Sequence, residues 1–197
     1  MTELDLEGVK RFHGHWCPGL ATGIRVAEIA LRELGPRSED EELVALVETD
    51  NCAVDAVQYF TGCTFGKGNL IHLDYGKNAF TFIRRSDGKA IRIVAKGAAW
   101  QPQDPALAEL AQRDRDGQVT AEERGRLREA RIRHILESPW AELFEVQQVQ
   151  PVVPAPAQVH QSVACAGCGE RTMETRLRRF QGQWYCLPCF QALERRR

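Results

Sequence analysis

The sequence has 197 residues, of which 43% are hydrophobic, enough for one domain of ordinary size and a small second one. No stretch approaches the roughly 18 consecutive apolar residues of a membrane-spanning helix, and the N-terminus lacks the pattern of a secretory signal, so we expect a cytoplasmic protein with no membrane segment. The net charge of −1 is unevenly distributed: from Cys165 onward seven arginines face three glutamates, a net of +4, which leaves −5 for the preceding residues.

The first half of the chain begins with a helical pattern. Apolar residues recur every three or four positions between Leu20 and Leu34, which predicts a core helix that stops at Gly35. The apolar run 43–47 predicts a short buried strand, and residues 55–60 predict a second helix. Strand and helix patterns therefore alternate here.

The following segments extend this mixed pattern. Three β-rich segments separated by turn-forming residues predict an antiparallel meander at 70–75, 79–84 and 90–95. Two helical patterns and a last strand are predicted at 104–113, 120–137 and 143–149, and the second helix opens with a Thr120-to-Glu123 capping box. The fold class predicted for this part is α+β.

A segment without charged residues divides the chain. Residues 151–163 contain three prolines and no Asp, Glu, Lys or Arg, which is typical of an extended, semi-rigid linker. We therefore expect an α+β core domain at residues 1–150, the linker at 151–163 and a small C-terminal domain at 164–197.

The small domain carries a four-cysteine motif. Two CxxC pairs separated by seventeen residues, Cys165 with Cys168 and Cys186 with Cys189, present four thiolates to one tetrahedral ion. About 30 residues cannot bury a sufficient core, so metal ligation is the expected source of stability. The motif predicts one structural zinc ion; four free or disulfide-linked cysteines are the alternative.

The pattern around these cysteines indicates a zinc-finger class. Residues 175–180 and 183–185 predict a hairpin, and 190–197 predict a helix after the second cysteine pair, which is the treble-clef arrangement. The arginines of this domain suit either nucleic-acid phosphates, an acidic protein or a solvated face, and the last is the commonest case.

A second group of metal-ligating side chains lies near the N-terminus. His13, His15 and Cys17 fall within five residues, directly ahead of the first predicted core helix, where a thiolate is favoured by the helix dipole. Cys52 lies between a predicted strand and a predicted helix, and Cys63 lies in a glycine-rich segment. These five residues are candidate ligands of a second site.

Three interpretations of this cluster compete. A zinc or iron site would use Cys17, a histidine and a distant cysteine, with one position left open for substrate. A redox loop is suggested by Trp16-Cys17-Pro18-Gly19, which resembles the thioredoxin motif, but Leu20 stands where the second thiol is required and excludes exchange within the loop. The third interpretation is a set of inert buried thiols and hydrogen-bonded histidines.

Other candidate sites are weaker. His72, His134 and His160 are interpreted as structural. The segment Gln112–Glu123 matches a twelve-residue calcium loop except at its first position, where glutamine replaces aspartate, and its Thr120–Glu123 pair is also explained as a helix cap.

Several motifs together resemble FmdE, a family associated with formylmethanofuran dehydrogenase. They are Phe12-His-Gly-His15-x-Cys17-Pro-Gly19, Cys52-x-x-Asp55-Ala-Val-Gln58, Thr61-Gly-Cys63-Thr-Phe-Gly-Lys67-Gly-Asn69, Asp74-Tyr-Gly-Lys77 and the four-cysteine tail. The resemblance covers nearly the whole chain. It implies a thioredoxin-like core with a mixed sheet flanked by helices, a treble-clef zinc domain and a homodimer. It also implies a metal site at His15 and Cys17, with Cys52 and Cys63 as nearby candidates.

The family takes its name from a molybdenum enzyme of one-carbon metabolism, but the three cysteines outside the tail are too few for a four-cysteine iron–sulfur cluster. The leading hypothesis is therefore a metal-binding accessory protein, assisting a molybdenum or tungsten oxidoreductase. One alternative is a stand-alone enzyme in which Cys17 or a metal-bound water is the nucleophile. The other is a nucleic-acid-binding regulator that uses the arginine-rich tail.

Overall fold

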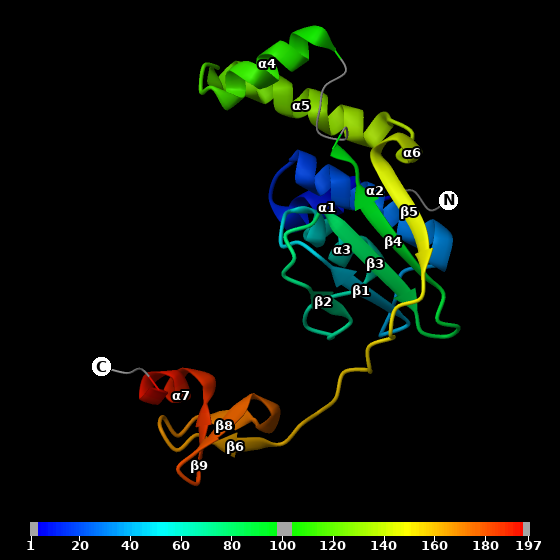
Figure 1. The fold of residues 1–197 in the computed structure, drawn as a ribbon. Helices are drawn as coiled ribbons and strands as arrows, with labels where there is room; N and C mark the ends of the chain where they lie inside the picture. Colours follow the sequence, from blue (N-terminus) through cyan, green and yellow to red (C-terminus); the bar gives the residue numbers. More distant parts are fainter. Residues whose placement is uncertain (1–3, 98–103, 195–197) are drawn as a thin grey trace. The chain divides into compact units, whose positions relative to one another are not determined.

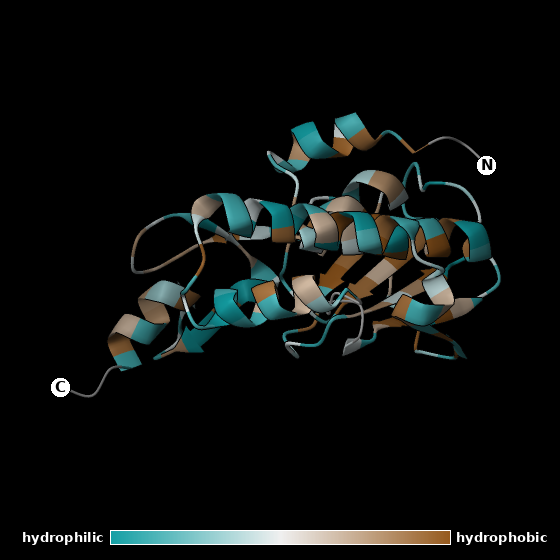
Figure 2. Ribbon diagram, turned by 90° about the horizontal axis from the view of Figure 1, so that it is seen from above, coloured by the Kyte–Doolittle hydropathy of each residue, from teal (hydrophilic) through white to brown (hydrophobic). Residues whose placement is uncertain are grey.

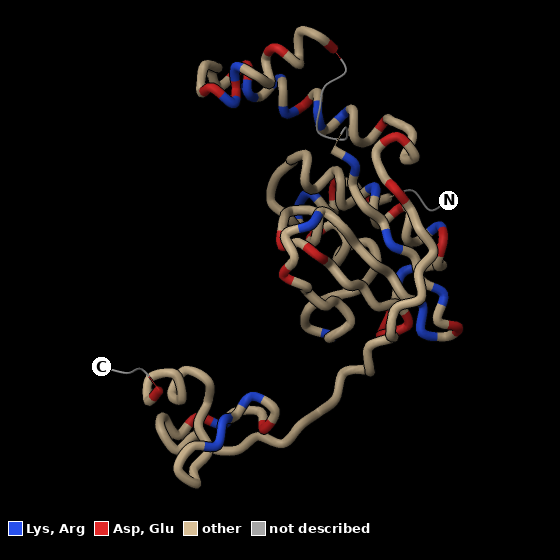
Figure 3. The backbone as a smooth tube through the Cα atoms, viewed as in Figure 1, with Lys and Arg blue, Asp and Glu red and all other residues tan. Residues whose placement is uncertain are grey.

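The computed structural model describes residues 4–97 and 104–194. These residues form two compact units, Met1–Pro156 and Ala157–Arg197. The boundary lies inside the segment predicted as a linker, and Figure 3 shows that this segment carries no charged side chain. Its first residues are tied to the larger unit, because the Arg85 guanidinium donates to the Pro154 carbonyl at 2.5 Å and pairs with Glu41 at 3.2 Å.

A five-stranded mixed sheet forms the centre of the larger unit (Figure 1). In spatial order its strands are β2 (Leu70–His72), β1 (Leu43–Val47), β3 (Ala79–Arg84), β4 (Ala90–Ala95) and β5 (Phe144–Val149). The β1–β2 pair is parallel and the three other pairs are antiparallel. The predicted mixed sheet and α+β class are thus confirmed.

The predicted meander is wrong at its first strand. β2 pairs with β1, and β1 separates it from β3. The residues that follow β2 donate to the end of β1, Leu73 to the Val47 carbonyl and Lys77 to the Glu48 carbonyl, each at 2.8 Å. These bonds carry the chain past the end of β1, so that β3 returns along its other edge.

Three helices cover one face of this sheet (Figure 1). They are α1 (Leu6–His13), α2 (Pro18–Leu34) and α3 (Ala53–Thr61). Buried side chains of α2 and α3, such as Ala21 and Val57, pack in one cluster with Phe80, Phe82 and Ile93 of the sheet. The apolar strands at the centre of this layer are brown in Figure 2. The two helices predicted in this part of the sequence are confirmed, whereas α1 was not predicted.

A helical hairpin precedes the last strand. It consists of α4 (Pro105–Arg115) and α5 (Ala121–Glu137), and α6 (Trp140–Leu143) leads into β5. Thr120 and Glu123 form the predicted capping box. Buried Leu127 and Ile135 attach α5 to the rest of the unit. Within the described ranges, no helix is both long and apolar enough to cross a membrane.

The smaller unit consists of two hairpins and a helix. The strands are β6 (Ser162–Ala164) with β7 (Arg171–Met173) and β8 (Leu177–Phe180) with β9 (Gln183–Cys186); a short 3-10 turn, η2 (Glu174–Arg176), precedes β8. Helix α7 (Leu187–Glu194) begins three residues before the predicted start at 190. The second hairpin was predicted, while the first was not.

Candidate metal centres

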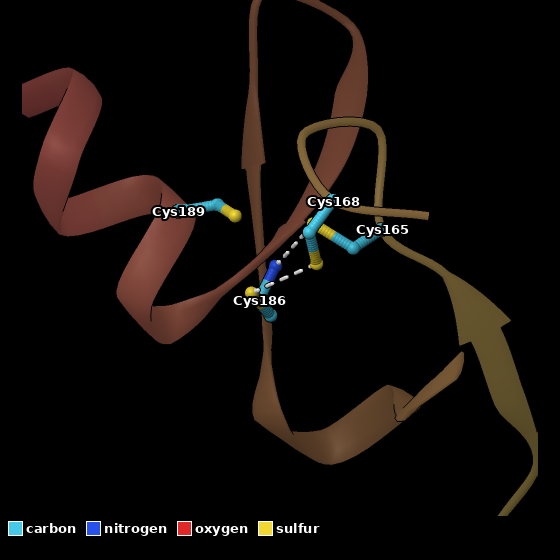
Figure 4. Close-up of side chains that lie close together, drawn as sticks. All are labelled: Cys165, Cys168, Cys186 and Cys189. Atoms are coloured by element: carbon cyan, nitrogen blue, oxygen red, sulfur yellow. Dashed lines mark hydrogen bonds between the residues drawn. The ribbon is translucent and has the colours of Figure 1, made fainter. Parts of the chain in front are cut away.

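The four C-terminal cysteines converge on one point (Figure 4). Cys165 and Cys168 lie in the turn between β6 and β7, Cys186 ends β9, and Cys189 lies in the first turn of α7. All four sulfur atoms lie within 4.8 Å of one another, and the Cys168 and Cys186 sulfurs are 3.9 Å apart. Tetrahedral zinc with bonds of about 2.3 Å separates its sulfur ligands by about 3.8 Å. The donor set therefore fits a closed structural zinc site.

Backbone amides prepare this site for a cation. The Cys165 sulfur accepts hydrogen bonds from the Cys186 amide at 3.2 Å and the Gly167 amide at 3.3 Å. These amide donors, Cys186 first, lower the pKa of Cys165 to about 6, so its thiolate is present at neutral pH. Neighbouring thiols of Cys186 and Cys168 raise the pKa of Cys189 to about 12. Crowding of four sulfurs without a counter-ion disfavours a second negative charge, which a divalent cation would compensate.

The larger unit contains a second donor group formed by His13, Cys17 and Cys52. The ligand atoms of these three residues all lie within 4.8 Å of one another, and the Cys17 sulfur is 3.7 Å from His13 Nε2. Each residue occupies a helix end: His13 is the last residue of α1, Cys17 is the N-cap of α2, and Cys52 precedes α3. For tetrahedral zinc, the expected sulfur-to-nitrogen separation is about 3.6 Å. The group therefore fits a metal that takes three protein ligands.

Asp55 orients the imidazole of His13. His13 Nδ1 lies 2.7 Å from Asp55 Oδ2, and because a carboxylate only accepts, Nδ1 is the donor. This bond leaves Nε2 unprotonated and directed toward Cys17. The His13 side chain is only 8% exposed, whereas that of Asp55 is 39% exposed. A carboxylate behind a histidine is the usual outer partner of a metal-ligating imidazole.

The cysteines of this group differ in environment. The Cys17 sulfur accepts the Leu20 amide at 3.3 Å and thus caps α2. Burial, together with the adjacent Cys17 thiol, raises the pKa of Cys52. Without a cation the two thiols therefore disfavour simultaneous ionisation.

Two glycines of α2 allow the cysteines to approach. A Cβ atom at Gly19 would lie 2.9 Å from the Cys52 Cβ, and one at Gly23 would lie 2.1 Å from the Ala53 carbonyl oxygen. The glycines are four residues apart and so share one helix face. The close contact of α2 with α3 that brings the thiols together therefore depends on the absence of side chains at these positions.

Two candidates from the sequence lie outside the group. His15 is exposed, and its ring stacks on the ring of His13 with centroids 4.5 Å apart. His13, which the chain places before the Gly14 turn, occupies the position expected for His15. Cys63 is fully buried in the core beside β1; its thiol donates to the Leu43 carbonyl at 3.5 Å, and burial raises its pKa.

The weaker candidates are placed as follows. His72 is exposed at the end of β2, His134 Nδ1 lies 3.0 Å from the Ser138 hydroxyl, and His160 Nδ1 lies 3.9 Å from Glu174. In the segment proposed as a calcium loop, Arg124 pairs with Asp114 at 3.0 Å and Arg113 with Glu123 at 3.1 Å.

The carboxylates of that segment therefore have cationic partners. Among the described residues, only the cysteine cluster and the His13 group bring three or more ligand atoms together.

Sequence reasoning named Asp55 only as a neighbour of Cys52 and gave no role to Gly19 or Gly23. The spacing Cys52-x-x-Asp55 was the available indication, since residues three apart share one helix face.

Comparisons with known proteins agree with both units. Residues 12–145 match a family model described as FmdE, molybdenum formylmethanofuran dehydrogenase operon. Residues 161–195 match the prokaryotic dksA/traR C4-type zinc finger.

Two known proteins resemble nearly the whole chain. A probable S-adenosyl-L-methionine-binding protein of Archaeoglobus fulgidus is 36% identical over 191 residues, covering 91% of this chain and 50% of that protein. The chain thus spans about half the length of this relative. A crystal structure from Syntrophus aciditrophicus, of a tungsten formylmethanofuran dehydrogenase FmdE-like protein, matches with a TM-score of 0.61 and 25% identity, covering 97% of this chain and 92% of that one.

Proposed function

Because the chain belongs to the FmdE family, we propose that it is a metal-binding accessory protein with two chemically different metal sites. The four C-terminal cysteines hold structural zinc. His13, Cys17 and Cys52 hold a second ion, zinc or iron, since imidazole and thiolate suit both metals. The observation that carries the proposal is this three-donor group, with His13 oriented by Asp55 at 2.7 Å.

The two sites differ in the number of protein donors. Four cysteines saturate a tetrahedral ion, which is typical of structural zinc. Three donors leave one position for an exogenous ligand, and an ion held there supplies Lewis-acid chemistry. In this proposal Cys17 and Cys52 neutralise the divalent charge, and His13 is kept neutral at Nε2 by its bond to Asp55. The second site is therefore the functional one.

The finer features of the proposal rest on the family. We assign a thioredoxin-like topology to the core and a treble clef to the zinc unit, and expect a homodimer in the cytoplasm. The partner proposed is a molybdenum or tungsten oxidoreductase. It is supported by the family description and by the name of the Syntrophus aciditrophicus protein.

Metal analysis of the purified, reduced chain tests the proposal. The wild type is expected to bind two ions per chain, and Cys17→Ala and Cys52→Ala one each, because two remaining donors hold an ion poorly. Cys63→Ala is the matched control: it removes a thiol that is buried outside the group and should leave two ions bound. Equal metal content in the wild type and Cys17→Ala would disprove the ligand assignment.

A second candidate function, an enzyme with Cys17 as nucleophile, is supported by the Leu20 amide that donates to the Cys17 sulfur. Thiol-labelling rates of the metal-free chain distinguish it from the first. A nucleophilic Cys17 is labelled faster than Cys52 and Cys63. If Cys17 is labelled no faster than Cys52, this second candidate is excluded.

A further inference from the structure

A cavity of about 450 Å³ adjoins the three-donor group of the larger unit. His13, Cys52 and Asp55 form part of its wall, so a molecule inside it would lie beside the proposed metal ligands. The other lining residues are of two kinds, the polar Thr49, Asp50, Asn51, Gln58 and His72, and the apolar Val47, Val54, Phe65 and Leu70. The volume suits a small organic molecule.

The charge of the lining is negative. It contains two carboxylates, Asp50 and Asp55, and no lysine or arginine among the described residues that form it. Asp55 is engaged by His13, whereas Asp50 is exposed and has no ion-pair partner in the described part of the chain. With a divalent ion balanced by two thiolates, these carboxylates leave the cavity with net negative charge.

Nearby lysines do not offset this charge inside the cavity. The Lys67 ammonium is bound by the carbonyls of Glu39 and Asp40 at 3.1 and 2.8 Å. The Lys77 ammonium lies 5.8 Å from the centre of the Tyr75 ring. A cation that enters the cavity is therefore attracted by the lining, while a carboxylate or phosphate is repelled.

Phe65 supplies an apolar surface at the same cavity. This residue is 77% exposed, so core packing does not account for its position. The glycine-rich segment holds it in place, because the Phe65 amide donates to Gln58 Oε1 at 3.1 Å and the Thr64 amide to Asn69 Oδ1 at 2.9 Å. An exposed aromatic ring fixed beside a cavity offers a stacking surface for a flat apolar group and, by its quadrupole, for a cation.

We propose that this cavity binds small organic cations that carry a flat apolar group, such as arylalkylammonium ions, and discriminates against anions of the same shape. Asp50 provides the charge selection and Phe65 the apolar contact. The proposal rests on the proposed function only in placing the bound molecule beside the metal ligands. It names the class of molecule that the functional site admits.

A matched pair of probes tests the charge selection. Phenethylammonium and 3-phenylpropionate have a similar size and opposite charge, and their binding to the full chain is followed by NMR shifts of the side-chain amides of Asn51 and Gln58. The cation should bind at least about tenfold more tightly than the anion. Asp50→Asn should reduce this ratio to about threefold or less, and Phe65→Ala should weaken both probes. Glu129→Gln, which removes an exposed charge on α5, should leave the ratio unchanged.

Each outcome decides the proposal. Equal or tighter binding of the anion, no binding of either probe, or a ratio that persists in Asp50→Asn would refute it. The titration is run in the zinc-free and zinc-loaded chain, and metal content is measured separately. Loss of the second metal with intact charge selection would overturn the proposed function alone, whereas two bound ions without selection would overturn this inference alone.

Discussion

The contact between α2 and α3 leads to a prediction that links packing to metal binding. In Gly23→Ala the new Cβ would lie 2.1 Å from the Ala53 carbonyl oxygen and 2.7 Å from the Ala53 Cα. Both atoms belong to the backbone, so no side-chain rotation relieves the overlap. A carbon–oxygen contact is relaxed only beyond about 3.2 Å, so the two helices must separate by roughly 1 Å.

The magnitude follows from two opposing terms. Overpacking of a close interface costs about 3 kcal/mol at its upper range, and the better helix propensity of alanine returns about 1 kcal/mol. The free energy of unfolding of the larger unit should fall by about 2 kcal/mol, which corresponds to a loss of roughly 4–8 °C in its melting temperature. Since Cys17 and Cys52 stand at the ends of these helices, their sulfurs should also move apart and metal affinity at the larger unit should fall at least about tenfold.

Urea denaturation of the metal-free chain and zinc titration measure the two effects. Gly125→Ala is the control, because a Cβ at this position of α5 would have no atom within 4 Å. This control should raise stability by about 0.5–1 kcal/mol and leave zinc binding unchanged. A Gly23→Ala chain as stable as the wild type, with equal affinity for zinc, would show that the helices do not need this close contact.

Three further predictions concern the two units separately. Removal of zinc by a chelator should unfold the C-terminal unit and shift the NMR signal of the Trp184 indole to its unfolded position, while signals of the larger unit's core persist; an unchanged Trp184 signal would contradict a structural metal. Cys63→Ala should lower the free energy of unfolding by about 1 kcal/mol, because it leaves a small cavity and removes the hydrogen bond to Leu43; an unchanged urea midpoint would contradict this account. Acid should weaken the chain partly through Glu42, whose pKa the Ser38 hydroxyl and backbone amides lower to about 2: its contribution is complete above the unfolded value of about 4.5 and is lost as pH falls toward 2. Urea midpoints at pH 7 and pH 3 should therefore differ less in Glu42→Gln than in the wild type, and an equal difference would count against this role.

Local patterns account for the features that the sequence predicted well. The helix from 18 to 34 has an apolar face that repeats every turn and a glycine stop, so its position does not depend on distant residues. The same holds for the four-cysteine motif, because chelating pairs are set by their spacing along the chain. By contrast, β2 was assigned to the wrong neighbour, since nothing in its three residues distinguishes an edge beside β1 from an edge beside β3.

Helix α1 shows why one ligand was misplaced. Its own residues form a short helix whose cap, Asp5, accepts from the Gly8 amide at 2.8 Å and also from the Tyr59 hydroxyl at 2.7 Å. The second bond joins α1 to α3 and is invisible in the sequence, where the two residues are 54 apart. The Asp5 cap and the left-handed Gly14 were present as local signals, and together they would have placed His13 at a helix end.

The two sites therefore depend on the fold in different ways. The C-terminal cysteines come from one short segment, so ligation can order the segment that contains the ligands. The three donors of the larger unit come from the ends of α1, α2 and α3, and the His13–Asp55 bond spans 42 residues, so their geometry is set by helix packing before any metal arrives. A site assembled by a rigid scaffold can keep a coordination position empty without collapsing, because the metal is not needed to hold its ligands in place. That property is what an exchangeable or reactive metal requires, and it explains why the less conspicuous of the two sequence motifs forms the proposed functional site.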